Sequence, residues 1–325
     1  MSTDPDRSIE TLIRLAGERE LPSDEATARA RDAAEASWRR MLASKPARPG
    51  SRIPLALAAA LALVALGWYA WMQRDAAPPV VVARVAAVDG GARIRRGRAN
   101  QIARLQDEVT SGAILQTADG RAAATIADAL SLRLDNNTRL RFDGRDRVTL
   151  LEGALYVDSG GLGLRPPLTI NTPAGEVRHI GTQFQVRVSG DITSIRVREG
   201  RVALRRGDAI ARTVTAGDAL EVRGTDERWQ HGLASFGPGW EWSAALAPTL
   251  AIEDRPLAEF LAWMAREHGW QLHFSNESLQ KRAQEIHLHG SLEGLDAAAM
   301  LERVALVTGV PLALDEGVLW VGASR

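Results

Sequence analysis

Two histidines are the residues of this sequence whose spacing most resembles a metal site. His287 and His289 lie two positions apart in the stretch EIHLHGSL, so both would point to one face of a strand, a spacing that a metal ion can use. No carboxylate motif accompanies the pair, and two surface histidines on an edge strand explain it equally well. We therefore expect no metal site.

Two other short motifs invite a catalytic interpretation. The stretch LDNNT at 134–138 offers a carboxylate, but Asp and Asn also cluster in turns because their side chains bond the nearby backbone. The stretch GGLG at 160–163 is not followed by the helix N-terminus that a phosphate-binding loop needs. The chain has no cysteine, which removes thiolate catalysis and Cys-based zinc sites together. The sequence predicts no enzyme and no cofactor.

Trp240 and Trp242 form a third motif, in the stretch FGPGWEWSAALAP at 236–248. If exposed, the two rings could bind carbohydrate or a partner, whereas buried rings would pack at a joint between two domains. We favour the joint, because the hydrophobic pattern changes on either side of this stretch.

One uncharged run interrupts the polar pattern of the chain. Residues 53–72, IPLALAAALALVALGWYAWM, carry no charge over 20 residues, which matches a bilayer core of about 30 Å. Three aromatic rings lie near its C-terminal end, where a headgroup region favours them. The run predicts one transmembrane helix.

The charges that flank this run predict its orientation. Five basic residues and no acidic residue precede it: Arg39, Arg40, Lys45, Arg48 and Arg52. Because positive flanks stay in the cytoplasm, we expect a cytoplasmic N-terminus and a periplasmic C-terminal bulk, in a single-pass protein of the bacterial inner membrane. Over the whole chain 40 basic and 40 acidic residues balance, so no overall charge would attract nucleic acid.

The predicted cytoplasmic segment, residues 1–52, contains two short amphipathic patterns. Ile9, Leu12, Ile13 and Ala16 recur at helical spacing, and a second helix is expected from about Asp24 to Leu42. Two short helices bury too little surface to fold firmly alone. The apolar positions therefore predict a partner that completes the core, and a solvated tail is the alternative.

Two further domains are expected after residue 80. Residues 80–225 alternate apolar and polar residues, and the units LLEGALYV and VREGRVAL repeat a strand, glycine turn, strand pattern. This predicts an all-β domain, either a β-solenoid or a sandwich. Residues 247–325 read as two β-α-β units in tandem, which predicts a small α+β domain. One of its helices is expected to end at Gly269, and the other to be capped by Asp296 and to end at Gly309. The predicted fold class is thus mixed: helical segment, transmembrane helix, all-β domain and α+β module.

The exported part resembles the FecR-type transmembrane sigma-factor regulators. The resemblance lies in GAILQTADGRAAATIADALSLRLDNNTRL, LLEGALYV, INTPAGEVRHIGTQFQVRV and VREGRVAL, and residues from about 250 resemble the short N-terminal module of secretins and TonB-dependent receptors. Six residues occupy the positions of the family's strand-turn-strand signature: Thr172, Gly175, Val177, Gly181, Thr182 and Phe184. Of these, Gly181 is expected at a tight or backbone-crowded position, and Phe184 is expected in the core.

The resemblance implies a signal relay between two partners. The C-terminal part would receive a signal from the signalling domain of a TonB-dependent outer-membrane receptor, and the cytoplasmic segment would bind an extracytoplasmic-function sigma factor, as an anti-sigma factor does. Trp38 and Leu42, with Ile9, Leu12 and Ile13, are the expected sigma-factor contacts. The cytoplasmic segment is shorter than is common in the family. An envelope structural protein that binds a surface polymer or a secretion channel is the alternative.

Overall fold

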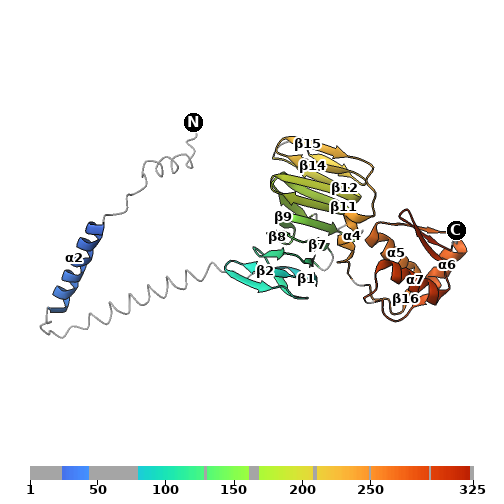
Figure 1. Ribbon diagram of the computed structural model, residues 1–325, viewed down its shortest axis with the longest axis horizontal. Helices are drawn as coiled ribbons and strands as arrows, with labels where there is room; N and C mark the ends of the chain where they lie inside the picture. The colour runs from blue at the N-terminus through green and yellow to red at the C-terminus, as the bar shows by residue number, and fades with distance from the viewer. Residues whose placement is uncertain are drawn as a thin grey trace. The chain divides into compact units, whose positions relative to one another are not determined.

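The computed structural model describes residues 24–43, 80–127, 130–160, 168–207, 211–248, 250–292 and 294–322 (Figure 1). The chain divides into two units, residues 1–76 and 77–325, which we describe separately. The predicted first helix with Ile9, Leu12 and Ile13, and the uncharged run 53–72, lie outside the described residues.

One helix, α2 (Asp24–Ala43), is described in the first unit. It begins at the predicted residue and ends one residue after the predicted Leu42. In the described part of the chain, no helix combines the length and the apolarity needed to cross a membrane. The predicted fold class is therefore wrong in its transmembrane helix. The helix that is long enough, α2, carries charged residues throughout its 20 residues, and a hydrocarbon core excludes them.

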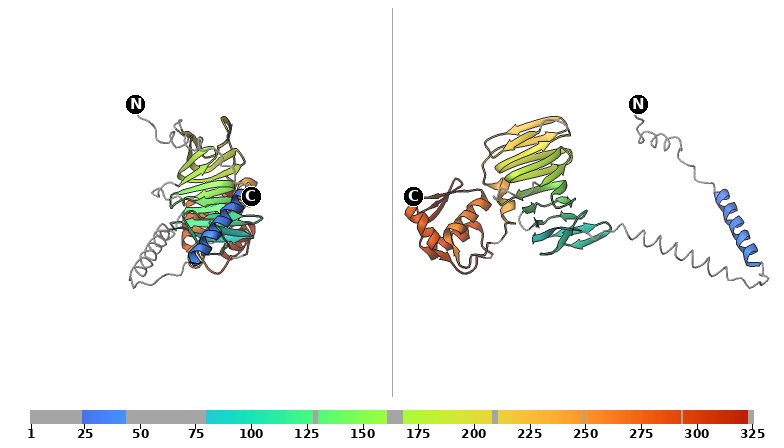
Figure 2. Two further views of the ribbon diagram at one scale, coloured as in Figure 1. Left: turned by 90° about the vertical axis from the view of Figure 1, so that its left-hand side faces the viewer. Right: turned by 180° about the vertical axis from the view of Figure 1, so that it is seen from behind.

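Fifteen strands of the second unit form one branched sheet. They are β1 (Val81–Asp89), β2 (Ala92–Arg96), β3 (Ala99–Ile102), β4 (Glu108–Thr110), β5 (Ile114–Thr117), β6 (Arg121–Ile126), β7 (Leu130–Leu134), β8 (Arg139–Phe142), β9 (Arg147–Asp158), β10 (Thr169–Thr172), β11 (Gly175–Ser189), β12 (Ile192–Arg205), β13 (Arg212–Thr215), β14 (Ala219–Arg223) and β15 (Asp226–Gln230). Figure 2 shows them stacked from the teal β1 and β2 to the yellow β15.

The strands of this sheet form two series of paired strands, which we call the first and the second ladder and which share three long strands. The first ladder runs β15-β14-β12-β11-β9-β7-β6-β1-β4, and the second runs β13-β12-β11-β10-β9-β8-β5-β2-β3. The strands β9, β11 and β12 belong to both, one half in each. All neighbours are antiparallel except β9 and β10, which are parallel. The described fold is thus mostly β, with long strands passing from one ladder to the other.

Glycines occupy the points where the long strands change ladder. Gly153 in β9, Gly181 in β11 and Gly200 in β12 all have positive φ angles, of 89°, 60° and 77°. A Cβ at Gly200 would lie 2.4 Å from the carbonyl oxygen of Gly181, and one at Gly153 would lie 2.3 Å from Thr138. The predicted glycine turns at Gly153 and Gly200 are therefore bends within continuous strands, at positions that leave no room for a Cβ.

A single hydrophobic core lies between the two ladders. It joins Val148, Ile170 and Val202 of the second ladder to Leu155 and Phe184 of the first. All five side chains are fully buried, as predicted for Phe184. In the alternating sequence pattern, the apolar residues therefore point into this core and the polar residues point to the outer faces of the sheet.

The C-terminal module follows a short helix, α4 (Pro238–Ala244). Its elements are β16 (Arg255–Pro256), α5 (Leu257–His268), β17 (Gln271–Phe274), α6 (Glu277–Glu285), β18 (His287–Leu288), α7 (Ala297–Thr308), β19 (Leu312–Asp315) and β20 (Val318–Val321). The strand β20 lies between β17 and β19, parallel to β17 and antiparallel to β19. A second hydrophobic core contains Phe260, Leu261 and Leu319.

Local sequence signals, such as helix caps and glycine stops, predicted the ends of two of these helices. As predicted, Asp296 caps α7, because its side chain accepts a hydrogen bond from Ala299 N at 2.8 Å, and Gly269 and Gly309 end α5 and α7 in the left-handed conformation. The helix α6 was missed, although Asn276 caps it in the same way. Its sequence ESLQKRAQE buries only Ala283, so it lacks the apolar period that identifies a helix.

Candidate functional site

The helix α2 presents an exposed aromatic and apolar face. Trp38 is 69% exposed and Met41, one turn further on, is 78% exposed. Arg29 lies on the opposite side of the helix, nine residues before Trp38. Leu42 is in α2, but its side chain lies outside the described residues. Trp38 is therefore available to a partner within the described part of the chain.

The six signature residues form scaffold. Thr172 and Gly175 close the β10–β11 hairpin, where the Thr172 hydroxyl donates to Gly175 O at 2.9 Å. Val177 and Phe184 are core residues, and Thr182 N donates to the Ser159 hydroxyl at 2.8 Å. Gly181 has the positive φ expected of a tight position, but a Cβ there would meet open space. The crowded glycine is Gly200, on the neighbouring strand.

Trp240 and Trp242 lie at a joint between the sheet and the C-terminal module. They project from α4, which Figure 1 shows beside the sheet. Their side chains, 1% and 9% exposed, pack with Tyr156 and Ala154 of β9 on the outer face of the first ladder. The Tyr156 ring meets both indoles edge-on, at centroid distances of 6.2 and 6.5 Å. Trp242 Nε1 donates to Gln185 Oε1 at 3.3 Å. The prediction of a joint is confirmed.

A buried ion pair crosses this joint. Arg133 of β7 is 0% exposed, and its Nη2 lies 2.7 Å from Oε2 of Glu267, near the end of α5. The contact is close without the alignment of a hydrogen bond. Nη1 of Arg133 donates to the carbonyl oxygen of Ser243 in α4 at 2.8 Å, and the guanidinium lies 5.1 Å from the Tyr156 ring centre. One side chain of the sheet thus holds both α4 and α5.

Two further arginines join the same elements. Arg198 of β12 donates from Nη1 to the Tyr156 hydroxyl at 3.2 Å and to Glu267 O at 3.1 Å, and lies over the Trp240 ring at 4.6 Å. From the other side, Arg266 of α5 pairs with Asp158 of β9 and, at 2.8 Å, with Glu199 of β12. Charges of both signs therefore alternate across the joint.

Burial changes the titration of these groups. It raises the pKa of the Glu267 carboxyl despite the attraction of Arg133, and it raises the pKa of the Tyr156 hydroxyl. Burial lowers the pKa of His268, next to Glu267, to about 4, with smaller contributions from Arg198 and Arg133. At neutral pH His268 is therefore uncharged, stacked on Trp270 at 4.4 Å.

Apart from the two tryptophans, the sequence contains few signals that predict the joint. Arg133, Tyr156 and Arg198 occupy outward positions of their strands, where an alternating pattern places solvent-exposed residues. Three polar side chains at outward positions look alike in sequence whether water or a helix covers them.

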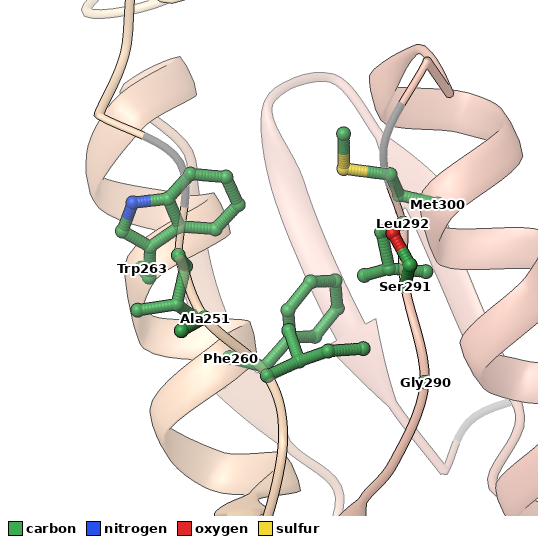
Figure 3. A pocket seen from close by; sticks show the side chains of 9 residues that line it. Ala251, Phe260, Trp263, Gly290, Ser291, Leu292 and Met300 are labelled. Carbon is green, nitrogen blue, oxygen red and sulfur yellow. The ribbon is translucent and has the colours of Figure 1, made fainter.

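An apolar cavity of about 290 Å³ opens in the C-terminal module between α5 and the segment before α7 (Figure 3). Phe260 and Trp263 line one side, and Leu292 and Met300 the other. The remaining lining residues are Leu250, Ala251, Ile252, Gly290 and Ser291.

A larger cavity of about 630 Å³ adjoins the first and reaches the joint. The two share Trp263, Leu292 and Met300, and the larger is also lined by Glu241 of α4 and by Glu267. A molecule that entered these cavities would therefore touch both the C-terminal module and the carboxylate that pairs with Arg133.

The two histidines whose spacing resembles a metal site, His287 and His289, have separate partners. His289 Nδ1 lies 3.1 Å from Glu253, and His287 Nδ1 lies 3.0 Å from Glu285 O. Within the described residues, no group of three or more His, Cys, Asp or Glu side chains could hold a metal ion.

Comparison with known proteins identifies the domain that carries the joint. Residues 113–203 match the model of the family described as FecR protein. Two crystal structures of "a putative anti-sigma factor" from Parabacteroides distasonis ATCC 8503 are similar over 65% of this chain and 99% and 97% of theirs, at 14% identity and TM-scores of 0.34 and 0.33. The search of curated proteins found no match. The similarity to the FecR family thus covers the part of the sheet from which Arg133, Tyr156 and Arg198 contact α4 and α5.

Proposed function

We propose that this protein regulates an extracytoplasmic-function sigma factor, which its N-terminal segment binds. The observation that carries the proposal is the FecR match over residues 113–203. The exposed Trp38 and Met41 on α2 support it, because an aromatic ring with an aliphatic neighbour can anchor a helix in the groove of a partner.

The regulator would relay a signal from the C-terminal module through the FecR domain. The joint supports this role, because Arg133, Arg198 and Arg266 tie α4 and α5 to the sheet. A partner that moves α5 must strain or break these contacts. The joint would then transmit the event to the FecR domain as a change in position.

The signalling domain of a TonB-dependent outer-membrane receptor is the proposed partner of the C-terminal module. The apolar cavity beside Phe260 and Trp263 supports a protein partner there, since it offers aromatic surface with few charges.

The location of the chain in the bacterial inner membrane also remains a proposal. It rests on the uncharged run and on the basic residues before it. Reporter fusions after Leu42 and after Ala77, using an enzyme that is active only in the periplasm, test it: activity after Leu42 but not after Ala77 would contradict the proposed orientation.

The sigma-factor partner is tested by a binding titration of the full chain with candidate sigma factors. We expect Trp38→Ala to weaken binding by about 30-fold, as loss of an anchor worth about 2 kcal/mol does. The matched control is Arg29→Ala, on the opposite side of α2, which should change the affinity less than twofold. Equal binding by both variants would remove Trp38 as the anchor, and no binding by the wild type to any candidate would favour the envelope structural protein.

A further inference from the structure

The β2–β3 hairpin concentrates positive charge in a protein whose net charge is zero. Residues 80–230 contain 23 arginines and 18 acidic residues, and five of these arginines lie within 92–105, the segment ARIRRGRANQIARL. No acidic residue occurs from Gly90 to Gln106. We call residues 92–105 the basic hairpin.

The pleat of the basic hairpin turns its charges outward. In β2, Ala92 and Ile94 are buried, while Arg93 is exposed and Arg95 is half-buried. Each residue of β3 is exposed, and β3 pairs with no strand but β2 in the described sheet. The basic hairpin is therefore an edge of the second ladder, open to a partner.

Its arginines form no ion pair with the carboxylates that the structure describes, unlike other arginines of the same sheet. Arg84 pairs with Glu108 at 3.0 Å, and Arg147 pairs with Glu176 at 3.1 Å. No ion pair to a described carboxylate is formed by the hairpin arginines, which are Arg93, Arg95, Arg96, Arg98 and Arg104. Their charge is therefore available to an anionic partner.

Two large apolar side chains share this exposed surface. Ile102 is 61% exposed and stands directly opposite Arg93 across the β2–β3 pair, so both lie on one face. Leu105, three residues later, is 62% exposed. Arginines interleaved with exposed aliphatic side chains suit the boundary between lipid headgroups and acyl chains, where phosphates meet the charges and the apolar groups leave water.

The hairpin also lies beside the strand at which the chain enters the domain. Gln106 N donates to Val85 O of β1, and the loop after the hairpin accepts from Val85 N at Asp107 O. The uncharged run ends at Met72, nine residues before Val81 at the start of β1, so a lipid surface met by that run is within about 30 Å of extended chain from β1.

We propose that the basic hairpin binds the surface of an anionic phospholipid bilayer, with Arg93, Arg98 and Arg104 on the headgroup phosphates and Ile102 and Leu105 in the interfacial region. This contact is independent of the proposed sigma factor and of the proposed receptor. It would hold the FecR domain against the membrane in one orientation.

The test is co-sedimentation with phosphatidylcholine vesicles, with and without phosphatidylglycerol. Residues 77–325 can be used, because they form a compact unit whose two main cores contain no residue before Val82. We expect binding that requires phosphatidylglycerol and weakens with salt. Arg93→Gln/Arg98→Gln/Arg104→Gln should weaken it by about 100-fold, at roughly fivefold for each arginine.

The control variant is Arg201→Gln/Arg205→Gln/Arg228→Gln, which removes the same charge from exposed positions on β12 and β15. It should weaken binding only a few-fold, and an effect equal to that of the hairpin variant would overturn the proposal. Ile102→Ser/Leu105→Ser should weaken binding about tenfold. If these two changes have no effect while the hairpin arginines still matter, the surface binds a soluble polyanion and the assignment to lipid is wrong.

Discussion

The ion pair between Arg133 and Glu267 gives the sharpest test of the joint. Arg133→Met keeps the apolar stem of the side chain and removes three interactions: the 2.7 Å contact with Glu267, the hydrogen bond to Ser243 O, and the contact with the Tyr156 ring. It leaves the 5% exposed Glu267 with an uncompensated charge. Removal of one partner of a buried pair costs about 3–5 kcal/mol, which we expect as the loss in free energy of unfolding.

A second substitution shows whether the cost comes from the orphaned charge. Glu267→Gln in the Arg133→Met background removes the carboxylate, so the double variant should recover most of the loss and lie about 1–2 kcal/mol below the wild type. Denaturant unfolding of residues 77–325, followed by tryptophan fluorescence and by circular dichroism, measures these differences. A loss under 1 kcal/mol for Arg133→Met, or no recovery in the double variant, would refute the conclusion that the charge of Glu267 needs Arg133 for stability.

The pH dependence gives an independent check. Because burial raises the pKa of Glu267 in the folded state, the folded protein binds this proton more tightly than the unfolded chain does. The corresponding stability is fully present below the unfolded pKa of about 4.3 and is lost as pH rises through the folded pKa. Because Arg133 lowers the pKa of the Glu267 carboxyl, that pKa in the folded state should rise further when Arg133 is removed. The cost of Arg133→Met should therefore be smaller at low than at neutral pH, and the double variant should lack this dependence.

Three further comparisons test the scaffold and the titration of His268. Gly200→Ala should destabilise the domain far more than Gly181→Ala in denaturant unfolding, since both have positive φ but a Cβ meets backbone at 2.4 Å only at Gly200; equal losses would contradict the crowding. Phe184→Ala should cost about 3–5 kcal/mol by forming a cavity, whereas Trp229→Ala, 39% exposed, should cost much less, and similar values would place Phe184 outside the core. His268, whose pKa falls to about 4 in the folded state, contributes stability that is present above about 6.5 and is lost as pH falls towards 4. His268→Gln should flatten this acid limb of the stability curve, and an unchanged limb would exclude His268 as its source.

The sequence by itself determined the elements whose signals are local. Alternation placed the strands, because each strand has one face on the core, and Asp296, Gly269 and Gly309 placed helix ends through capping and the left-handed conformation. It also indicated the FecR resemblance and the buried tryptophan pair. Phe184 could be assigned to the core for the same reason of alternation.

Only the tertiary structure decided which outward-facing residues are covered. Arg133 and Arg93 have the same residue type and the same outward position on a strand, yet one is buried against α4 and α5 and the other faces solvent on an edge hairpin. No local pattern separates them, because burial of an outer face depends on where a helix more than 100 residues away in sequence comes to lie. The same limit applies to the glycines: sequence marks where a strand can bend, but the neighbouring strand decides that Gly200 is crowded and Gly181 is open.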